Sequence, residues 1–235
     1  MIPGTIPAGN FVNTFGTRTV SYLGTDYIDG EEGSSFTFTG NSLGTPAANR
    51  WIIVGIHVLN NEDPQYNSTT TITSCTVNGY IAPIVIQTNY QTGGGDSGIC
   101  GIAVAYCPVG STGDVVVNTN GASDSMGISL WEANGLARFA PYDSDVDTAG
   151  ALSLTLDTLA DGFIIGIAMA EGTSSPSTWT NATERYDNAD VAATGLDTAT
   201  HKWTGADTTT AGSPITVSTS AASGSDSAMM LACSF

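Results

Sequence analysis

Apolar and polar residues alternate one by one along many short stretches of this chain, and this period of two is the feature that most restricts its fold. In ALSLTLDTL (151–159), Leu152, Leu154 and Leu156 fall on one side, and Ser153, Thr155 and Asp157 fall on the other. Alternation of this kind is typical of an antiparallel strand with one buried face and one solvated face. The same pattern predicts strands at 36–39, where phenylalanine alternates with threonine, and at 215–218.

Three longer stretches are instead apolar on both faces: RWIIVGIHVL (50–59), GICGIAVAYC (98–107) and GFIIGIAMA (162–170). In the second stretch, small side chains line one face at Gly101, Ala103, Ala105 and Cys107, and Gly166 and Ala168 repeat this in the third stretch. Small faces let another layer or another subunit approach closely. We therefore predict central strands that are covered on both sides, either by a further layer or at an interface.

Turn residues separate about a dozen such stretches, and no stretch of helical length is amphipathic. Together these patterns predict an all-β fold, an antiparallel two-sheet β-sandwich that is jelly-roll-like. We expect an extended N-terminal arm at 1–20, where prolines and glycines are frequent, and a single β-sandwich domain at 21–235. Within that domain, we expect 187–212 to be a long connection rich in alanine and threonine.

The chain is strongly acidic, with 22 Asp and Glu against five Lys and Arg and a net charge of −17. Nucleic acids and anionic membranes would repel such a surface, because nucleic-acid affinity depends on clustered Lys and Arg. The acidity is expected to keep a particle rich in serine and threonine soluble. The first residues, MIPGTIPAGN, have neither a basic nor a long apolar segment, so we expect no secretory signal and synthesis in a host cytoplasm.

Four cysteines, Cys75, Cys100, Cys107 and Cys233, lie in apolar strand-like stretches. They lack the Cys-x-x-Cys or nearby His spacing of a zinc site. We expect buried free thiols. The alternative is one disulfide that forms later, outside the cell.

The tetrad Gly-Asp-Ser-Gly within QTGGGDSGICG (91–101) matches the stretch in which chymotrypsin-like proteases carry their nucleophilic serine. Such a serine needs a histidine base and a buried aspartate, and the chain has only His57 and His201. His57 lies in an apolar strand-like run only 40 residues before Ser97, and Ile99 replaces the glycine that would follow the tetrad. We therefore interpret the tetrad as a turn between two strands.

Asp143, Asp145 and Asp147 stand at alternate positions, as the first ligands of a calcium loop would. Thr148 and Leu154 occupy the positions where an EF-hand needs glycine and glutamate, so an EF-hand is excluded. A solvated acidic loop is the expected structure, and a loosely bound cation is the alternative. We predict no metal site, with these three aspartates as the weak candidates.

Trp179, Tyr186 and Trp203 could form an aromatic platform for a sugar, as in carbohydrate-binding modules built on β-sandwiches. Packing in a core or an interface is the more general role of such residues. Paired catalytic carboxylates cannot be recognised from spacing in a chain with 22 acidic residues.

The chain resembles a β-sandwich family of structural proteins from tailed bacteriophages and related prophages in the order of six segments: RWIIVGIHVL, TVNGYIAPIV, GIAVAYCPVGSTGDVVVNTNGA, GISLWEANGL, PYDSDVDTAGALSLTLDTLADGFIIGIAMAEG and TWTNATERYD. The resemblance covers roughly 50–235 and lies in the sequence of strands and turns. It implies a virion component on the capsid or tail surface, and it supplies no catalytic residue.

From these observations we expect a non-enzymatic structural component of a bacteriophage virion, a capsid decoration or tail protein that acts through protein–protein packing. Its expected partners are other virion proteins and further copies of itself in a homo-oligomer, with no catalytic residue and no cofactor. The alternative is a receptor- or carbohydrate-binding module of a phage tail or fibre. In that case Trp179, Tyr186 and Trp203 would contact a host-surface glycan.

Overall fold

The computed structural model describes residues 17–29, 32–60, 70–91, 97–148, 150–171, 177–189, 201–209, 212–220 and 228–235. These residues form strands and turns without an α-helix, which confirms the predicted all-β class. No helix in this part of the chain is long and apolar enough to cross a membrane.

The first nine strands form two antiparallel sheets. These strands are β1 (Thr19–Ile28), β2 (Gly33–Ser42), β3 (Arg50–Asn60), β4 (Ile72–Val77), β5 (Tyr80–Ile81), β6 (Ile84–Gln91), β7 (Ser97–Tyr106), β8 (Thr112–Ser123) and β9 (Ser125–Asn134). The first outer sheet has the order β2-β8-β4-β5. The first inner sheet has the order β1-β9-β3-β7-β6.

The last eight strands form the other two sheets. They are β10 (Asp143–Asp147), β11 (Leu152–Leu156), β12 (Ile164–Glu171), β13 (Trp179–Thr180), β14 (Thr183–Ala189), β15 (His201–Thr208), β16 (Ile215–Thr219) and β17 (Ala228–Ser234). The second inner sheet has the order β10-β17-β12-β15-β14, and the second outer sheet has the order β11-β16-β13.

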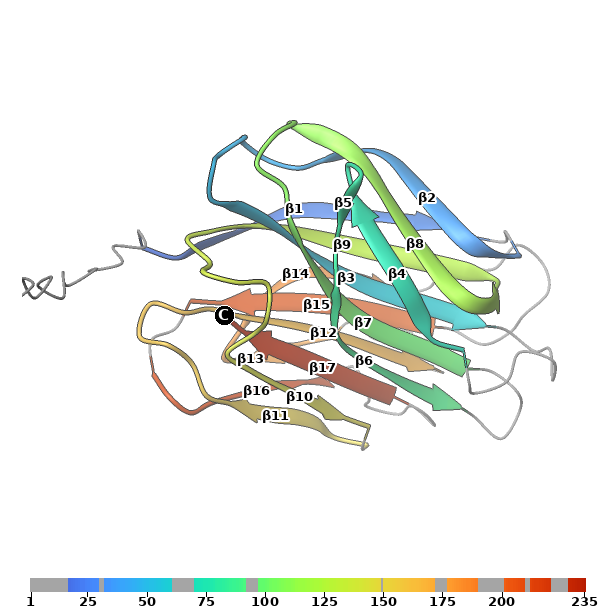
Figure 1. Ribbon diagram of the computed structural model, residues 1–235. Coiled ribbons are helices and arrows are strands. Elements are labelled where there is room, and N and C mark those ends of the chain that lie inside the picture. Colours follow the sequence, from blue (N-terminus) through green and yellow to red (C-terminus); the bar gives the residue numbers. More distant parts are fainter. Residues whose placement is uncertain are drawn as a thin grey trace, which may run out of the picture.

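The four sheets are stacked as layers, with the two inner sheets face to face (Figure 1). Three apolar cores separate the layers. The first core lies between the first outer and first inner sheets, the middle core between the two inner sheets, and the third core between the second inner and second outer sheets. The antiparallel sandwich is thus confirmed, but the described part of the chain builds four sheets where the alternation predicted two.

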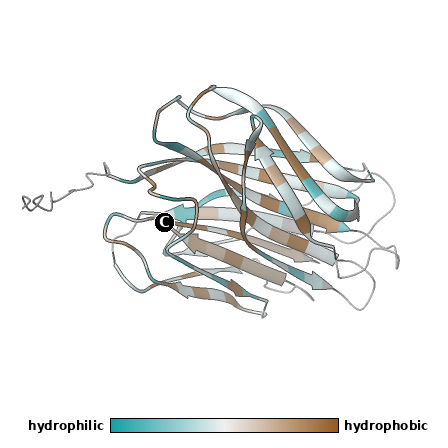
Figure 2. Ribbon diagram, viewed as in Figure 1, coloured by the Kyte–Doolittle hydropathy of each residue, from teal (hydrophilic) through white to brown (hydrophobic). Residues whose placement is uncertain are grey.

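Stacking explains why three stretches are apolar on both faces. Along β3, alternate residues such as Ile52 and Val54 face the first core, while Ile53 faces the middle core. β7 divides its side chains in the same way, and β12 divides its own between the middle and third cores. In Figure 2, apolar residues run continuously along β17 of an inner sheet and alternate with polar ones along β8 of an outer sheet. The covering layers therefore come from the same chain.

The first nine strands are nested: β1 pairs with β9, β2 with β8, and β3 with β7. The chain passes from one sheet to the other between β1 and β2, between β2 and β3, and between β3 and β4. A long hairpin that folds over onto itself gives this nested pairing, and a jelly roll is built in that way. The jelly roll stays a prediction for the chain. The single domain at 21–235 stays a prediction as well.

Two expectations about connections need correction. The segment 187–212, predicted as a connection, contains the whole of β15, which pairs with β12 on one side and β14 on the other. The buried residues of β15 include the polar Thr204 and Asp207. Because these positions are polar, the sequence of β15 lacks the apolar pattern by which the other strands were predicted. Of the predicted arm at 1–20, Thr19 and Val20 belong to β1, and residues 1–16 lie outside the described residues.

Glycines in the inner sheets make room for large rings from the facing sheet. A β-carbon at Gly127 on β9 would lie 2.5 Å from the ring of Trp203, which projects from β15. Trp203 is 4% exposed, so its ring has little space to move. The close approach of the two inner sheets at this point therefore depends on the missing side chain.

We predict that Gly127→Ala lowers the free energy of unfolding by about 1–3 kcal/mol, the usual cost of overfilling a packed core. Gly150→Ala is the matched control, because a β-carbon there meets nothing within 4 Å; its effect should stay within about 0.5 kcal/mol. Urea unfolding of both variants measures the difference. Equal stability of the two variants would contradict the close packing of Trp203 on Gly127.

Candidate functional site

A cluster of aromatic side chains lies in the middle core, towards the edge where β1 and β14 are the outermost strands of their sheets. We call it the interlayer cluster, and it consists of Tyr22, His57, Trp131, Tyr186 and Trp203. The first three come from β1, β3 and β9 of the first inner sheet, and the last two from β14 and β15 of the second. The cluster is therefore assembled by the contact between the two inner sheets.

Tyr186 is the centre of this cluster. Its ring centroid lies 5.6 Å from that of Trp203, 6.0 Å from that of Tyr22, 6.1 Å from that of His57 and 6.4 Å from that of Trp131. Spacings of this size are those of favourable offset and edge contacts between rings. Burial raises the pKa of the Tyr186 hydroxyl well above its usual value, so this group stays protonated at neutral pH.

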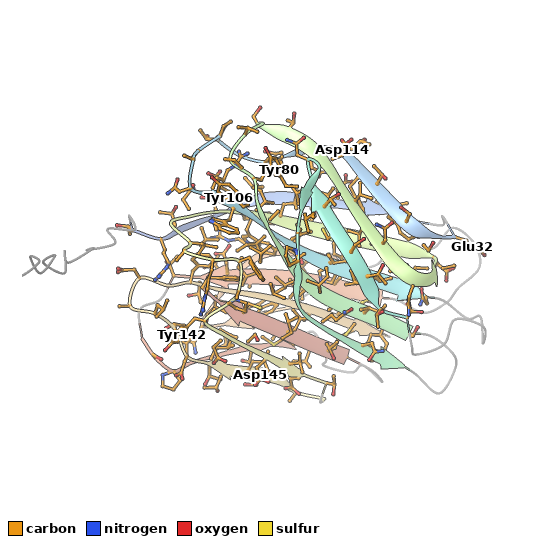
Figure 3. All side chains as sticks on the ribbon, in the orientation of Figure 1. Glu32, Tyr80, Tyr106, Asp114, Tyr142 and Asp145 are labelled. Atoms are coloured by element: carbon orange, nitrogen blue, oxygen red, sulfur yellow. The ribbon has the colours of Figure 1, made fainter. Side chains whose placement is uncertain are left out.

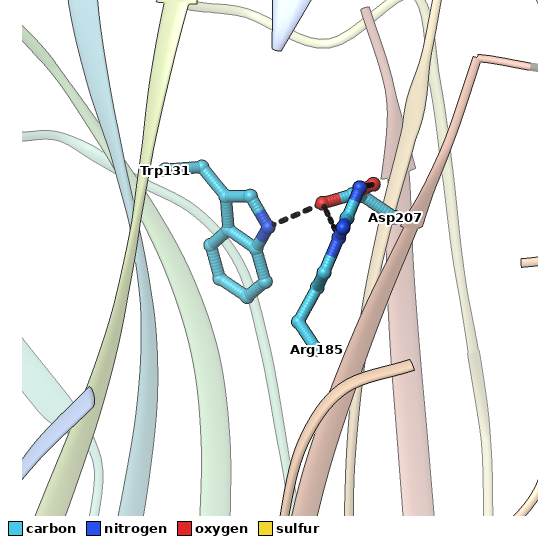
Figure 4. A network of polar contacts seen from close by, with 3 residues as sticks. All are labelled: Trp131, Arg185 and Asp207. Carbon is cyan, nitrogen blue, oxygen red and sulfur yellow. Dashed lines mark hydrogen bonds and ion pairs between the residues drawn. The ribbon is translucent and has the colours of Figure 1, made fainter. Parts of the chain in front are cut away.

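A buried carboxylate joins the two inner sheets beside the cluster (Figure 4). Asp207 on β15 accepts two hydrogen bonds from Arg185, at 2.8 Å from Nε and 2.7 Å from Nη2. Its Oδ2 also accepts a hydrogen bond of 2.9 Å from Nε1 of Trp131 on the facing sheet. Asp207 is 2% exposed, whereas the Arg185 side chain is 36% exposed. The arginine thus neutralises the carboxylate and reaches from the core to the surface.

His57 is buried in the same cluster without a hydrogen-bond partner for either ring nitrogen among the described residues. Its ring lies 5.0 Å from that of Trp203. Burial lowers the pKa of His57 to about 3, although backbone groups of Ala168 and Thr204 oppose the shift. A hollow of about 30 Å³ beside it is lined mainly by apolar side chains, Leu59, Met169 and Trp203 among them. The imidazole is therefore neutral and enclosed at physiological pH.

The interlayer cluster does not contain the serine of the tetrad. His57 pairs with Cys100 across β3 and β7, and both face the middle core. Ser97 pairs with Asn60, an odd number of positions along β3 from His57, and so points to the opposite face of the same sheet. Within the described part of the chain, the histidine and this serine cannot form a base–nucleophile pair. Ser97 and Gly98 also begin β7, so this half of the tetrad is strand and not turn.

The four cysteines are free and buried, as predicted. Cys75 and Cys107 lie in the first core, while Cys100 and Cys233 lie in the middle core. Burial raises the pKa of Cys75 to about 12 and raises those of Cys100 and Cys233 as well. Thiols in such surroundings are poor nucleophiles, because the thiolate is the reactive form.

The three aspartates proposed as weak metal candidates lie on β10, which is an edge strand and not the expected loop. Asp143 accepts a hydrogen bond of 2.9 Å from the N–H of Asp157, and Asp147 accepts one of 2.8 Å from the N–H of Ser153. No group of three or more metal-ligating side chains comes together in the described residues. Asp143, Asp145 and Asp147 are spread along one strand, where they do not converge on a point.

The proposed sugar platform is not an exposed surface. Tyr186 and Trp203 are 8% and 4% exposed and belong to the interlayer cluster. Trp179 lies on the other side of the second inner sheet, half-buried against the third core. Its Nε1 donates a hydrogen bond of 3.0 Å to the hydroxyl of Thr204. The structure thus separates the three residues: Tyr186 and Trp203 lie on strands of the second inner sheet, and Trp179 lies on β13 of the second outer sheet.

Sequence reasoning overlooked Arg50, which is fully buried at the start of β3. Its guanidinium donates to four carbonyl oxygens, those of Leu43, Cys107, Val109 and Gly110, at 2.6–2.9 Å. These hydrogen bonds connect the loop between β2 and β3 with the loop between β7 and β8 at the end of the first core. A charged residue directly before a fully apolar run is the signal that could have found it.

A second feature lies on the surface, at the end of the stack where β1 begins. Tyr106, Phe139 and Tyr142 are 44%, 45% and 50% exposed there. Figure 3 shows Tyr106 and Tyr142 on the same side of the view, the side where the chain enters β1. Arg18 and Arg138 line a hollow of about 50 Å³ together with Tyr142 and buried apolar residues.

Trp51 connects the two parts of this surface. Its ring lies 5.2 Å from that of Tyr106, and its Nε1 donates a hydrogen bond of 3.2 Å to the carbonyl of Leu136, which lines the hollow. We call this feature the arm-side surface; it consists of Arg18, Trp51, Tyr106, Leu136, Arg138, Phe139 and Tyr142. Tryptophan, tyrosine and arginine are the residues that most often dominate the binding energy of protein interfaces.

No family model, curated protein or solved structure matches this chain.

We predict that His57 makes stability depend on pH. Its folded pKa of about 3 lies below the usual 6.5, so the unfolded chain binds a proton first as the pH falls. The free energy of unfolding should therefore be independent of His57 protonation above about pH 6.5. Below that pH, the protonation of His57 in the unfolded chain should lower the free energy of unfolding by roughly 1.4 kcal/mol per pH unit, down to about pH 3. The measurement is the difference in unfolding free energy between the native chain and His57→Leu, from urea titrations at pH 7, 6, 5 and 4. A difference independent of pH would contradict the enclosed neutral ring.

We predict that Arg185→Met lowers the free energy of unfolding by about 3 kcal/mol, because it leaves the buried Asp207 carboxylate without its counter-charge. The double variant Arg185→Met/Asp207→Asn should recover part of that loss, since the amide carries no charge. Arg138→Met serves as the surface control and should change stability by less than about 0.5 kcal/mol. Urea unfolding measures all three; a loss in the double variant as large as in the single one would refute the role of charge.

Proposed function

We propose that this protein is a non-enzymatic structural component of a bacteriophage virion, on the capsid surface or in the tail, which acts by packing against other proteins. The observation that carries the proposal is the contrast between its interior and its surface. In the described part of the chain, the side chains that could take part in catalysis, such as His57 and Asp207, are buried. Exposed aromatic side chains and arginines lie on the arm-side surface instead.

The buried groups do not favour catalysis. A general base must reach the proton that it removes, and a nucleophile needs such a base or a lowered pKa. His57 is enclosed without a hydrogen-bond partner among the described residues, and the Asp207 carboxylate is occupied by Arg185 and Trp131. Burial raises the pKa values of the thiols of Cys75, Cys100 and Cys233. These groups act as packing elements.

The predicted homo-oligomer needs a different argument from the one the sequence suggested. The strands that are apolar on both faces are covered by sheets of the same chain, so they do not call for a neighbouring subunit. The arm-side surface now supports assembly instead, because exposed aromatic groups beside arginines are typical of protein interfaces. The resemblance over roughly 50–235 to structural proteins of tailed phages points the same way.

The residues on which the alternative of a glycan-binding module depended do not form an exposed platform in the structure. Tyr186 and Trp203 are buried between the inner sheets, and a stacking platform for sugar needs exposed ring faces. We therefore keep the structural role as the single proposal and use glycan binding as an outcome of its test.

We predict that the protein is part of the intact particle. Phage particles from a host that carries this gene should be purified on a density gradient and labelled with gold-conjugated antibody against the chain, because a virion component stays bound through purification. Regular labelling of heads or tails is the expected result, and particles from a deletion strain are the control.

Three results would contradict the proposal. One is recovery of the protein only in the soluble fraction, and another is hydrolase activity that Ser97→Ala abolishes. The third is specific binding on a glycan array that is lost in Trp179→Ala and Trp203→Ala while the fold is intact.

A further inference from the structure

The arm-side surface lacks a partner in the described structure. Arg18 and Arg138 form no ion pair with any described carboxylate, although the chain carries 22 acidic residues. Tyr142 lines the same hollow, Phe139 follows Arg138 in the chain, and Tyr106 contacts Trp51; these three rings are 44–50% exposed. Arginines that face a hollow next to exposed rings offer two kinds of contact: hydrogen-bond donors for oxygen atoms and flat apolar faces for packing.

One segment of the chain has the complementary chemistry. Residues 1–16, MIPGTIPAGNFVNTFG, contain no charged side chain, whereas all 22 acidic and five basic residues of the chain follow them. The segment carries the apolar residues Ile2, Ile6, Phe11, Val12 and Phe15. It joins the described structure at Thr17, directly before Arg18, and so ends at the rim of the hollow.

The two Ile-Pro pairs of this segment suit an aromatic surface with arginines. In general, proline disfavours the helical conformation of the residue that precedes it. Proline-containing extended segments bind in grooves lined by tyrosine and tryptophan, which pack against the proline ring. Carbonyl oxygens of an extended segment are free to accept hydrogen bonds from guanidinium groups. An uncharged segment also avoids the repulsion that would meet any acidic part of a chain with a net charge of −17.

We infer that residues 1–16 of one copy bind the arm-side surface of a neighbouring copy. The inference rests on the proposed function, since an exchanged segment requires copies that assemble. Sixteen extended residues span up to about 50 Å, which is enough to cross an interface and reach the same end of another copy. When each copy donates one segment, every arm-side surface is filled once, and the assembly is a closed symmetric oligomer where the rotation between copies closes.

A cross-linking experiment on the full chain tests the inference. A photoreactive phenylalanine analogue replaces Ile6, and copies labelled with ¹⁴N and ¹⁵N are mixed, dissociated, reassembled and irradiated. Mass spectrometry of the digest should find cross-links from position 6 to peptides containing Tyr106 or residues 136–142, with both isotopes in one cross-linked pair. If every cross-linked pair carried a single isotope, the segment would cover its own copy, and cross-links elsewhere would mean a different site; either result overturns the inference.

Two full-chain variants test which surface holds the segment. Tyr142→Ser removes an exposed ring of the arm-side surface, and Ile81→Ser is the matched control because Ile81 is exposed on β5 of the first outer sheet. Tyr142→Ser should weaken self-association at least about tenfold, the usual effect of truncating an aromatic anchor. Ile81→Ser should leave it unchanged. Equal association of both variants would overturn the inference.

Sedimentation equilibrium of the native chain separates this inference from the proposed function. If the chain self-associates and the cross-links fall outside the arm-side surface, the exchanged segment is wrong while assembly stands. If the chain stays monomeric at every concentration, the exchange is wrong, and labelling of the particle alone decides the proposed function. Mixed-isotope cross-links to the arm-side surface together with self-association support the exchange.

Discussion

Contact between the two inner sheets is the interaction on which the rest of this structure depends. Each inner sheet is covered on both faces, so its strands exclude water from side chains on either side. Within the described residues, the first outer sheet packs on the first inner sheet, and the second outer sheet packs on the second inner sheet. The middle core therefore joins two halves of the chain, and glycines such as Gly127 determine how closely the halves approach.

Burial on this scale requires that each polar group in the interior be satisfied or neutral, because an unpaired charge there is costly. Arg50 meets the requirement with four backbone carbonyls at the end of the first core. Asp207 meets it with Arg185 and the indole of Trp131. His57 meets it by losing its proton, as its pKa of about 3 indicates. Arg50 and Asp207 therefore connect different parts of the stack through hydrogen bonds, whereas His57 is an enclosed neutral ring.

The same division between interior and surface underlies the proposed role. Residue types that often serve catalysis, histidine, cysteine and buried aspartate, are enclosed in the described part of the chain and act as packing or bridging elements. The types that dominate protein interfaces are exposed together on the arm-side surface. In the proposed role, the four stacked sheets would be the rigid body of the protein, and the arm-side surface would bind the neighbouring proteins.

The period of two in the sequence was enough to predict the all-β class and most strands, because alternation between buried and solvated faces is a local property of each strand. It failed at β15 and β10, where Thr204, Asp207 and the three aspartates place polar residues at strand positions. Sequence alone also found the buried cysteines and the absence of a calcium-loop pattern. The number of layers, the burial of Tyr186 and Trp203, and the opposite directions of His57 and Ser97 were decided by tertiary structure. An apolar face has the same pattern whichever sheet covers it, so only the folded chain determines which faces meet.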